Sequence, residues 1–414
     1  MTRTCRFGIA TVVVGLCLGV TVMPASAQNP EPQTRADALR QEREQKATQL
    51  EPPTPNRLEK ALLDLEAGRF FERILNPAEG LYPKFGTITA GSGFAVGPGY
   101  RATQRLGGAV DFSTFAMGSI KKYWIADARV QLPRLLDEHL GIDAHVQTYD
   151  FQEELFFGLG ADSARTDLVH YGMRNTIVGG SAALQPTSWL TFTGRADFLN
   201  PRIESATDDD GTIYTRFDDS TAPGLTGQPD FMRYEATADV NLREPRGNPR
   251  QGGRYLFTYQ RFDDLDDNLF SFRRAEVDLQ QYISLLRNRR VLALRALASV
   301  SDADDGAQIP FYYQRALGGP DDLRGFHRLR FRDTHALLLQ AEYRWEIFTA
   351  VDGALFYDAG KVASRVEDLD LRDLESDYGI GFRFGTANGV FLRIEAAFGS
   401  SDGKHFIFRF NNVF

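Results

Sequence analysis

Cysteine, long hydrophobic runs and excess positive charge are all scarce in this chain. Its 414 residues include two cysteines, Cys5 and Cys17, so a disulfide is excluded everywhere beyond the N-terminus. After Ala27 no apolar run reaches the roughly 18 residues that a transmembrane helix needs. The formal net charge of -8 argues against nucleic acid as a partner. The glycine and proline contents, 38 and 18 residues, exclude a collagen-like chain.

Residues 1–27 have the pattern of a secretory signal. Arg3 and Arg6 precede an apolar run over residues 8–22, and small residues follow at 25–27, where a signal peptidase needs them. The pattern predicts that residues 1–27 are a cleaved signal peptide and that the mature chain begins at Gln28. The protein is therefore expected to leave the cytoplasm.

Residues 233–242 alternate strictly between polar and apolar side chains. The apolar set is Tyr234, Ala236, Ala238, Val240 and Leu242, and the polar set is Arg233, Glu235, Thr237, Asp239 and Asn241. A period of two predicts a β-strand with one apolar and one charged face. The same split recurs at residues 274–281, 337–346, 379–384 and 392–398.

Two all-β folds show this alternation, a soluble sandwich and a membrane barrel. In a sandwich the polar face lies in bulk water, whereas in a barrel it lines a wet lumen and the apolar face meets lipid. The strands are long, about ten residues, which at a tilt near 45° spans an apolar band of roughly 25 Å. Because charges also recur on the polar face of many successive strands, the barrel is favoured.

The connectors predict sixteen antiparallel strands in one transmembrane β-barrel over residues 81–414. Short links, as at 244–252 and 287–289, alternate with long ones, as at 201–230 and 302–334. In such barrels the short turns face the periplasm and the long loops face outward, so 302–334 is predicted to be an extracellular loop that inserts into the barrel. Glycines blur the pattern over residues 82–117, where the first three strands are predicted at 82–90, 92–103 and 106–117. The fourth strand is predicted at 119–133.

Residues 28–80 are predicted to form a short, charged and helical segment in the periplasm. Residues 35–50 are charged, prolines follow at 52, 53 and 55, and apolar residues over 56–75 recur at helical spacing. Two roles are open for this segment. It either stabilises the barrel from below, or it acts as a plug or as a docking arm for a periplasmic or surface partner protein or a second copy of the chain.

Three motifs follow one another towards the C-terminus. The first has Gly318 and Gly319 before Arg324, Gly325 and Phe326; the second has Phe356, Asp358 and Gly360; the third has Gly379, Gly381 and Arg383. The chain then ends in an aromatic run with Phe406, Phe408, Phe410 and Phe414. Together these motifs resemble the BamA/TamA superfamily of outer-membrane barrels, also called the bacterial surface antigen family.

The resemblance implies a location in the Gram-negative outer membrane and a role in inserting or translocating protein, or lipid. It implies that the terminal phenylalanines are an assembly signal for the barrel itself. It also implies contact of the loop arginine, Arg324, with the barrel wall. Family members carry periplasmic POTRA domains of about 75 residues, and residues 28–79 are too few for one, so a member without them is expected.

The residues themselves suggest how such a contact would form. Asp358 shares a strand face with Ala354 and Phe356, so it points into the lumen if Leu355 and Tyr357 meet lipid. An inward-folded loop would then bring the Arg324 guanidinium to this carboxylate, with Arg383 in support. Gly379 and Gly381 are expected to leave room for the loop backbone. The alternative is that Arg324 lies in an exposed loop and Asp358 is solvated.

Two other classes of function are weighed against protein or lipid insertion. The first is a gated or passive channel whose lumen is occluded by the loop that carries Arg324. The second is an enzyme, which the sequence does not favour, because its six histidines show no metal-ligand spacing and no nucleophile motif is present. Neither a cofactor nor a metal is expected. Predicted partners are outer-membrane lipid and lipopolysaccharide, the latter bridged by divalent cations if the acidic turns at 208–211 and 302–306 bind them.

Overall fold

The computed structural model describes residues 79–409, with the exception of residues 90, 207–211, 287, 349 and 387–388. The predicted signal peptide and nearly all of the predicted helical segment lie outside the described residues, as do Phe410 and Phe414. Within the described part, no helix is both long and apolar enough to cross a membrane.

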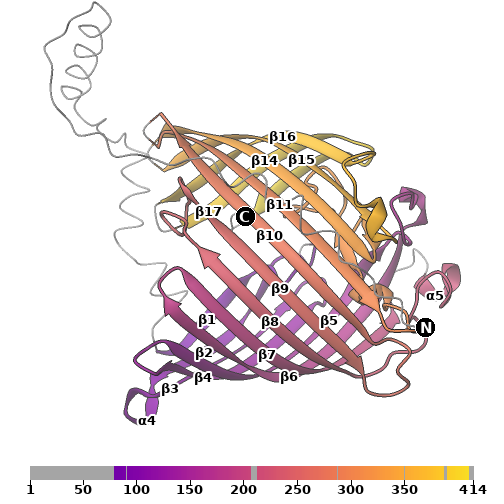
Figure 1. Ribbon diagram of the computed structural model, residues 1–414, viewed down its shortest axis with the longest axis horizontal. Helices are drawn as coiled ribbons and strands as arrows, with labels where there is room; N and C mark the ends of the chain where they lie inside the picture. The colour runs from indigo at the N-terminus through magenta and orange to yellow at the C-terminus, as the bar shows by residue number, and fades with distance from the viewer. Residues whose placement is uncertain are drawn as a thin grey trace, which may run out of the picture. The chain divides into compact units, whose positions relative to one another are not determined.

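Sixteen antiparallel strands form one sheet in which each strand pairs with the next one along the chain. In Figure 1 the strands run obliquely side by side and the sheet curls, so that it has an inner and an outer face. The strands are β1 Gly80–Gly86, β2 Ala95–Gln104, β3 Val110–Ser119, β4 Trp124–Leu135, β5 Leu140–Phe156, β6 Val169–Thr187, β7 Leu190–Ser205, β8 Phe231–Asn241, β9 Gly252–Asp264, β10 Phe272–Leu285, β11 Arg290–Ala303, β14 His335–Phe348, β15 Val351–Ala363, β16 Glu375–Thr386, β17 Gly389–Ser400 and β18 Gly403–Arg409.

Smaller elements lie in the links between these strands. A two-stranded sheet, β12 Arg315–Leu317 with β13 Phe331–Asp333, forms within the link between β11 and β14. The helices in the described residues are one turn long: α4 Arg105–Gly108, η2 Arg165–Asp167, α5 Ile213–Arg216, η3 Phe311–Tyr313 and η4 Val366–Asp368. The all-β class predicted from the sequence is confirmed.

The two faces of the sheet have the polarity of a membrane protein. On β15, Leu355 and Tyr357 are 49% and 51% exposed, whereas Phe356 and Asp358 between them are buried. Neighbouring strands repeat the pattern, with large apolar residues exposed on the outer face and ionised residues buried on the inner face. This polarity is the reverse of that in a soluble sandwich and matches a wall whose outer face meets lipid.

The first strands depart from the predicted boundaries. β3 begins at Val110 rather than at residue 106, and β4 begins at Trp124 rather than at 119. The reason is local: Gln104 has a left-handed φ of 54° and starts the single turn of α4, which delays the next strand. Leu106 within α4 is left-handed too, and another left-handed residue, Lys122, lies in the turn before β4. The first strand, β1, begins at Gly80, within the segment predicted to be helical.

The link between β8 and β9 crosses the short-loop end of the sheet. Within residues 242–251, Arg246 donates a hydrogen bond to the carbonyl of Ser188 in the link between β6 and β7. Arg250 Nη2 lies 2.7 Å from Asp352 Oδ2, on the inner face of β15. Since β7 and β15 are far apart in the strand order, this link runs across the inner face of the sheet at its short-loop end.

Candidate functional site

The link between β11 and β14, residues 304–334, folds against the inner face of the sheet. Its side chains Leu317, Leu323, Phe326 and Phe331 are 0–2% exposed and form one apolar cluster with the wall. The wall contributes Leu297, Ala336, Leu338 and Val362 to this cluster. The inserted loop, as we call residues 304–334, is therefore packed against the inner face of the sheet rather than exposed.

Arg324, near the middle of the inserted loop, binds Asp358 on β15 through two parallel hydrogen bonds. Its Nε lies 2.6 Å from Asp358 Oδ2 and its Nη2 lies 2.8 Å from Oδ1. The guanidinium carbon lies 3.5 Å from the centre of the Phe356 ring, which adds a cation–π contact. Both ionised side chains are fully buried, so water does not compete for these bonds.

The third nitrogen of this guanidinium reaches two more carboxylates. Arg324 Nη1 lies 3.0 Å from Glu342 on β14 and 3.1 Å from Glu395 on β17. Arg383 on β16 contacts the same two carboxylates, and Arg344 Nε lies 2.5 Å from Glu342. One loop arginine is therefore held in a network of buried charges from four successive wall strands.

The sequence motifs identified only part of this network. Arg324, Asp358 and Arg383 lie together, whereas Glu342 and Glu395 had not been singled out. The signal for both was present, because each lies on the charged face of a strand that the alternation predicts. Which of these charges converge depends on the course of the inserted loop.

The predicted role of two glycines is wrong in detail. A Cβ on Gly379 would overlap the Phe356 ring, and one on Gly381 would lie 2.6 Å from Glu395 Cγ. These glycines therefore make room for wall side chains rather than for the loop backbone. The close approach of loop to wall occurs at Gly325, where a Cβ would lie 2.5 Å from Asp377 Cβ.

Three other motif glycines shape the inserted loop. Gly318 and Gly319 have φ values of 113° and 106°, which L-residues rarely adopt, and they turn the chain before Arg324. A Cβ on Gly360 of β15 would lie 3.1 Å from Leu317 Cδ1, so this wall glycine accommodates a loop side chain.

Three other arginines also fix the inserted loop, through contacts with the rest of the chain and, in the case of Arg332, also within the loop. Arg328 forms two hydrogen bonds, of 2.6 and 3.0 Å, with Glu154 on β5. Arg330 Nε lies 3.2 Å from Asp402 in the turn between β17 and β18, and Arg332 Nη1 donates to the carbonyl of Phe311 at 2.7 Å. The loop thus connects β5 with the last strands of the sheet. No sequence motif pointed to Arg328, Arg330 or Arg332.

Asp402 lies outside the strands, in the turn between β17 and β18, and its carboxyl group has a lowered pKa. Burial opposes its ionisation, but hydrogen bonds from the side chain and backbone of His327 outweigh this and hold the pKa of Asp402 at about 2. His327 Nδ1 lies 2.8 Å from Asp402 Oδ2. The turn is thus anionic at every physiological pH and faces the cationic side of the inserted loop.

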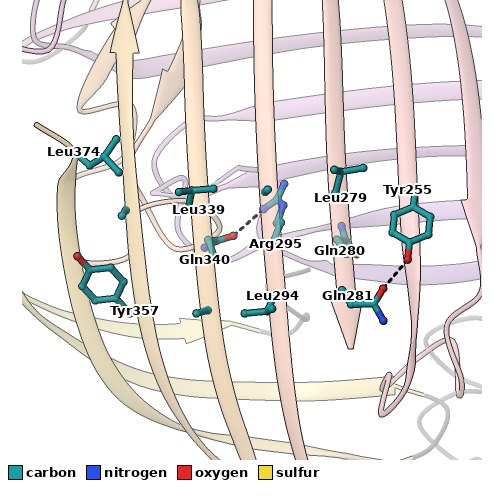
Figure 2. A pocket seen from close by; sticks show the side chains of 13 residues that line it. Tyr255, Leu279, Gln280, Gln281, Leu294, Arg295, Leu339, Gln340, Tyr357 and Leu374 are labelled. Atoms are coloured by element: carbon teal, nitrogen blue, oxygen red, sulfur yellow. Dashed lines mark hydrogen bonds between the residues drawn. The ribbon is translucent and has the colours of Figure 1, made fainter. Parts of the chain in front are cut away.

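Phe406 and Phe408 of the predicted assembly signal lie on the outer face of β18. They are 84% and 60% exposed. Elsewhere on the outer face, side chains of β9, β10, β11, β14 and β15 line an apolar pocket of about 540 Å³. In Figure 2, Tyr255 and Tyr357 stand at opposite ends of this pocket, and the Tyr255 hydroxyl donates to Gln281 at 2.6 Å. None of the charged residues around Arg324 lines it.

Metal binding finds no support in the described residues. Among them, no group of three or more histidine, cysteine, aspartate or glutamate side chains could hold a metal ion. In the acidic turn at 302–306, Asp302 is paired with Arg273 and Asp304 with Arg261. The other acidic turn, at 208–211, lies outside the described residues.

Comparison with known proteins identifies a family. The model of the Omp85 superfamily domain matches residues 96–411. Among solved structures, the chain is similar to BamA from Haemophilus ducreyi lacking POTRA domains 1–3, with a TM-score of 0.59 and 14% identity over 84% of this chain and 77% of that one. It is also similar to CdiB from Escherichia coli, with a TM-score of 0.50 and 14% identity over 80% of this chain and 61% of that one. Curated protein sequences give no match.

Proposed function

This chain belongs to the Omp85 superfamily, and from that premise we propose that it inserts or translocates protein, or lipid, at the Gram-negative outer membrane. It is an outer-membrane protein of the BamA/TamA type. The proposal includes closure of the sixteen-stranded sheet into a barrel at β1 and β18, the two ends of the strand order. It assigns no enzymatic step to the protein.

The observation that carries the proposal is the burial of Arg324 among three carboxylates. Removing one partner from a buried ion pair costs about 3–5 kcal/mol, so the inserted loop is not easily displaced from the lumen. The network around Arg324 is thus proposed to act as a lock between loop and wall. With the lumen blocked, a client is expected to enter the membrane at the seam between β1 and β18.

The first strand has features of an edge that opens. β1 has seven residues, whereas β5, β6 and β7 have 16 to 19. Pro83 of β1 lies directly opposite Pro98 of β2, and neither residue has an N–H to donate. A short and weakly bonded edge is the kind of strand to which a client strand can add.

The other proposed contacts concern lipid and partner proteins. The outer face, with Phe406 and Phe408 among its exposed aromatic residues, is proposed to contact outer-membrane lipid and lipopolysaccharide. Residues 28–80 are proposed to dock a partner protein or a second copy of the chain, or to support the barrel from below.

The test is insertion of a client. The full chain is reconstituted in liposomes, an unfolded outer-membrane barrel is added, and its folding is followed by the shift of its band on a gel without heating. We expect faster folding than with liposomes that hold an unrelated barrel of similar size. Equal rates for a panel of outer-membrane clients would refute insertion as the function.

A channel is the alternative, and one observation favours it. Charged residues on the inner faces of β4 and β8, such as Arg129 and Glu235, are 19–29% exposed, as in a lumen that holds water. Against it, the inserted loop and the link at 242–251 both obstruct the lumen. Conductance across a planar bilayer separates the two: a steady, high conductance indicates a channel, and a small, erratic one indicates an occluded barrel.

A further inference from the structure

The inserted loop holds the last hairpin, β17–β18, near one end of β18. Asp321 of the loop lies 3.3 Å from Arg393 Nη2 on β17 and 3.0 Å from Arg409 Nη2 on β18. Arg393 Nη2 also donates to the carbonyl of Pro320 at 2.8 Å. One loop carboxylate therefore connects both strands of the hairpin to the loop.

Without Asp321, arginines on neighbouring strands would repel one another at this end of the hairpin. Arg383, Arg393 and Arg409 lie directly opposite one another on β16, β17 and β18. Like charges directly opposite on neighbouring strands are destabilising. Glu395 lies 3.1 Å from both Arg383 and Arg393, but among the carboxylates of the described residues only Asp321 forms an ion pair with Arg409.

The loop also holds the hairpin at its turn. Asp402 accepts hydrogen bonds from the backbone N–H of His327 at 3.0 Å and from Arg330 Nε at 3.2 Å. Ser400 at the end of β17 donates to the carbonyl of Gly325. Arg165, in the link between β5 and β6, donates to the Asp402 carbonyl at 3.2 Å. The two ends of the hairpin are thus fixed to the same loop.

The pairing within the hairpin is irregular. Between β17 and β18 there is a register shift between Ala397 and Ser400. β18 is the last strand of the sheet order, and its apolar residues Phe406 and Phe408 point outward instead of packing into a core. Contacts with the inserted loop therefore add to the strand pairing that holds β18 in the described residues.

We propose that Asp321 and Asp402 are positioning residues that fasten the β17–β18 hairpin to the inserted loop, so that movement of the loop releases the edge of β18. The use of this release to admit a client rests on the proposed function. The fastening itself does not, because it follows from contacts within the chain.

The test is backbone hydrogen exchange of the full chain in detergent, measured by mass spectrometry. In Asp321→Ala and in Asp402→Ala, peptides covering residues 403–409 should exchange about tenfold faster than in wild type, the effect of losing hydrogen bonds to a charged group. Peptides covering 252–264, in β9, should not change. The matched control is Asp304→Ala, which loses an ion pair with Arg261 but does not touch the hairpin.

Two results would overturn the proposal. One is unchanged exchange over 403–409 in both variants; the other is an equal rise in β9, which would indicate general destabilisation. If Asp321→Ala does not fold, Arg409→Gln serves instead, because it leaves Asp321 paired with Arg393. Exchange is measured without a client. The two results are therefore independent. If the variants exchange faster at β18 but the wild-type protein folds no client, the fastening is upheld and the insertion function is refuted.

Discussion

Replacing Arg324 by alanine tests whether the inserted loop is locked to the wall. The variant leaves three buried carboxylates, Asp358, Glu342 and Glu395, without their shared cation. The contacts that remain differ among these three carboxylates. Glu342 and Glu395 keep contacts with Arg383, whereas Asp358 keeps a hydrogen bond from Gln340 Nε2 at 3.1 Å.

The loss of stability is expected to come mainly from Asp358, because the other two carboxylates keep their contacts with Arg383. Breaking a buried ion pair by removing one partner costs about 3–5 kcal/mol, mainly because the other charge stays buried. Arg324→Ala should therefore unfold on a gel at a clearly lower temperature than wild type. Arg324→Lys should fall between them, because an ammonium keeps the charge but loses the two parallel hydrogen bonds and the planar contact with Phe356.

A second substitution identifies the cause. In Arg324→Ala combined with Asp358→Asn the uncompensated charge is removed, so part of the lost heat resistance should return. The assay is the temperature at which the compact band converts to the unfolded band in a heating series. An Arg324→Ala variant as heat-resistant as wild type would refute the lock. A double variant weaker than the single one would refute the assignment to Asp358.

Three further predictions concern the loop and its contacts. Gly325→Ala should lower heat resistance, because its Cβ would lie 2.5 Å from Asp377 Cβ, whereas Gly194→Ala, with open space around the new atom, should not. Phe326→Ala should cost about 3–5 kcal/mol, the usual effect of emptying a buried aromatic site, and equal stability would contradict the packing of the loop. Asp402 has a pKa of about 2 in the folded chain against an ordinary 3.8, so its stabilisation is complete above that ordinary value and is lost as the pH falls towards 2. Heating series over this range should show a smaller acid effect in Asp402→Asn than in wild type.

The polarity of the wall could be predicted because it is a local property. In a strand, successive side chains point to opposite faces, so the alternation at residues 233–242 was enough to separate the inner from the outer face of β8. The boundaries of β3 and β4 could not be predicted as well. They depend on the left-handed residues Gln104, Leu106 and Lys122, none of which is a glycine or an asparagine.

The partners of the inserted loop were beyond local reasoning. The motifs brought Arg324 and Asp358 to attention through a family resemblance, and the functional role of this pair stays a prediction. Glu342, Glu395 and Asp402 are ordinary acidic residues in the sequence. They become partners of the loop because the fold brings together segments that lie up to 75 residues apart in the chain, such as His327 and Asp402.

By itself, the sequence determined an all-β chain whose strands have one apolar and one charged face, because that periodicity is set residue by residue along the backbone. The tertiary structure decided which charges meet. The curl of the sheet brings β14 to β18 around one loop, and in that dry interior a guanidinium and three carboxylates must satisfy one another because water cannot.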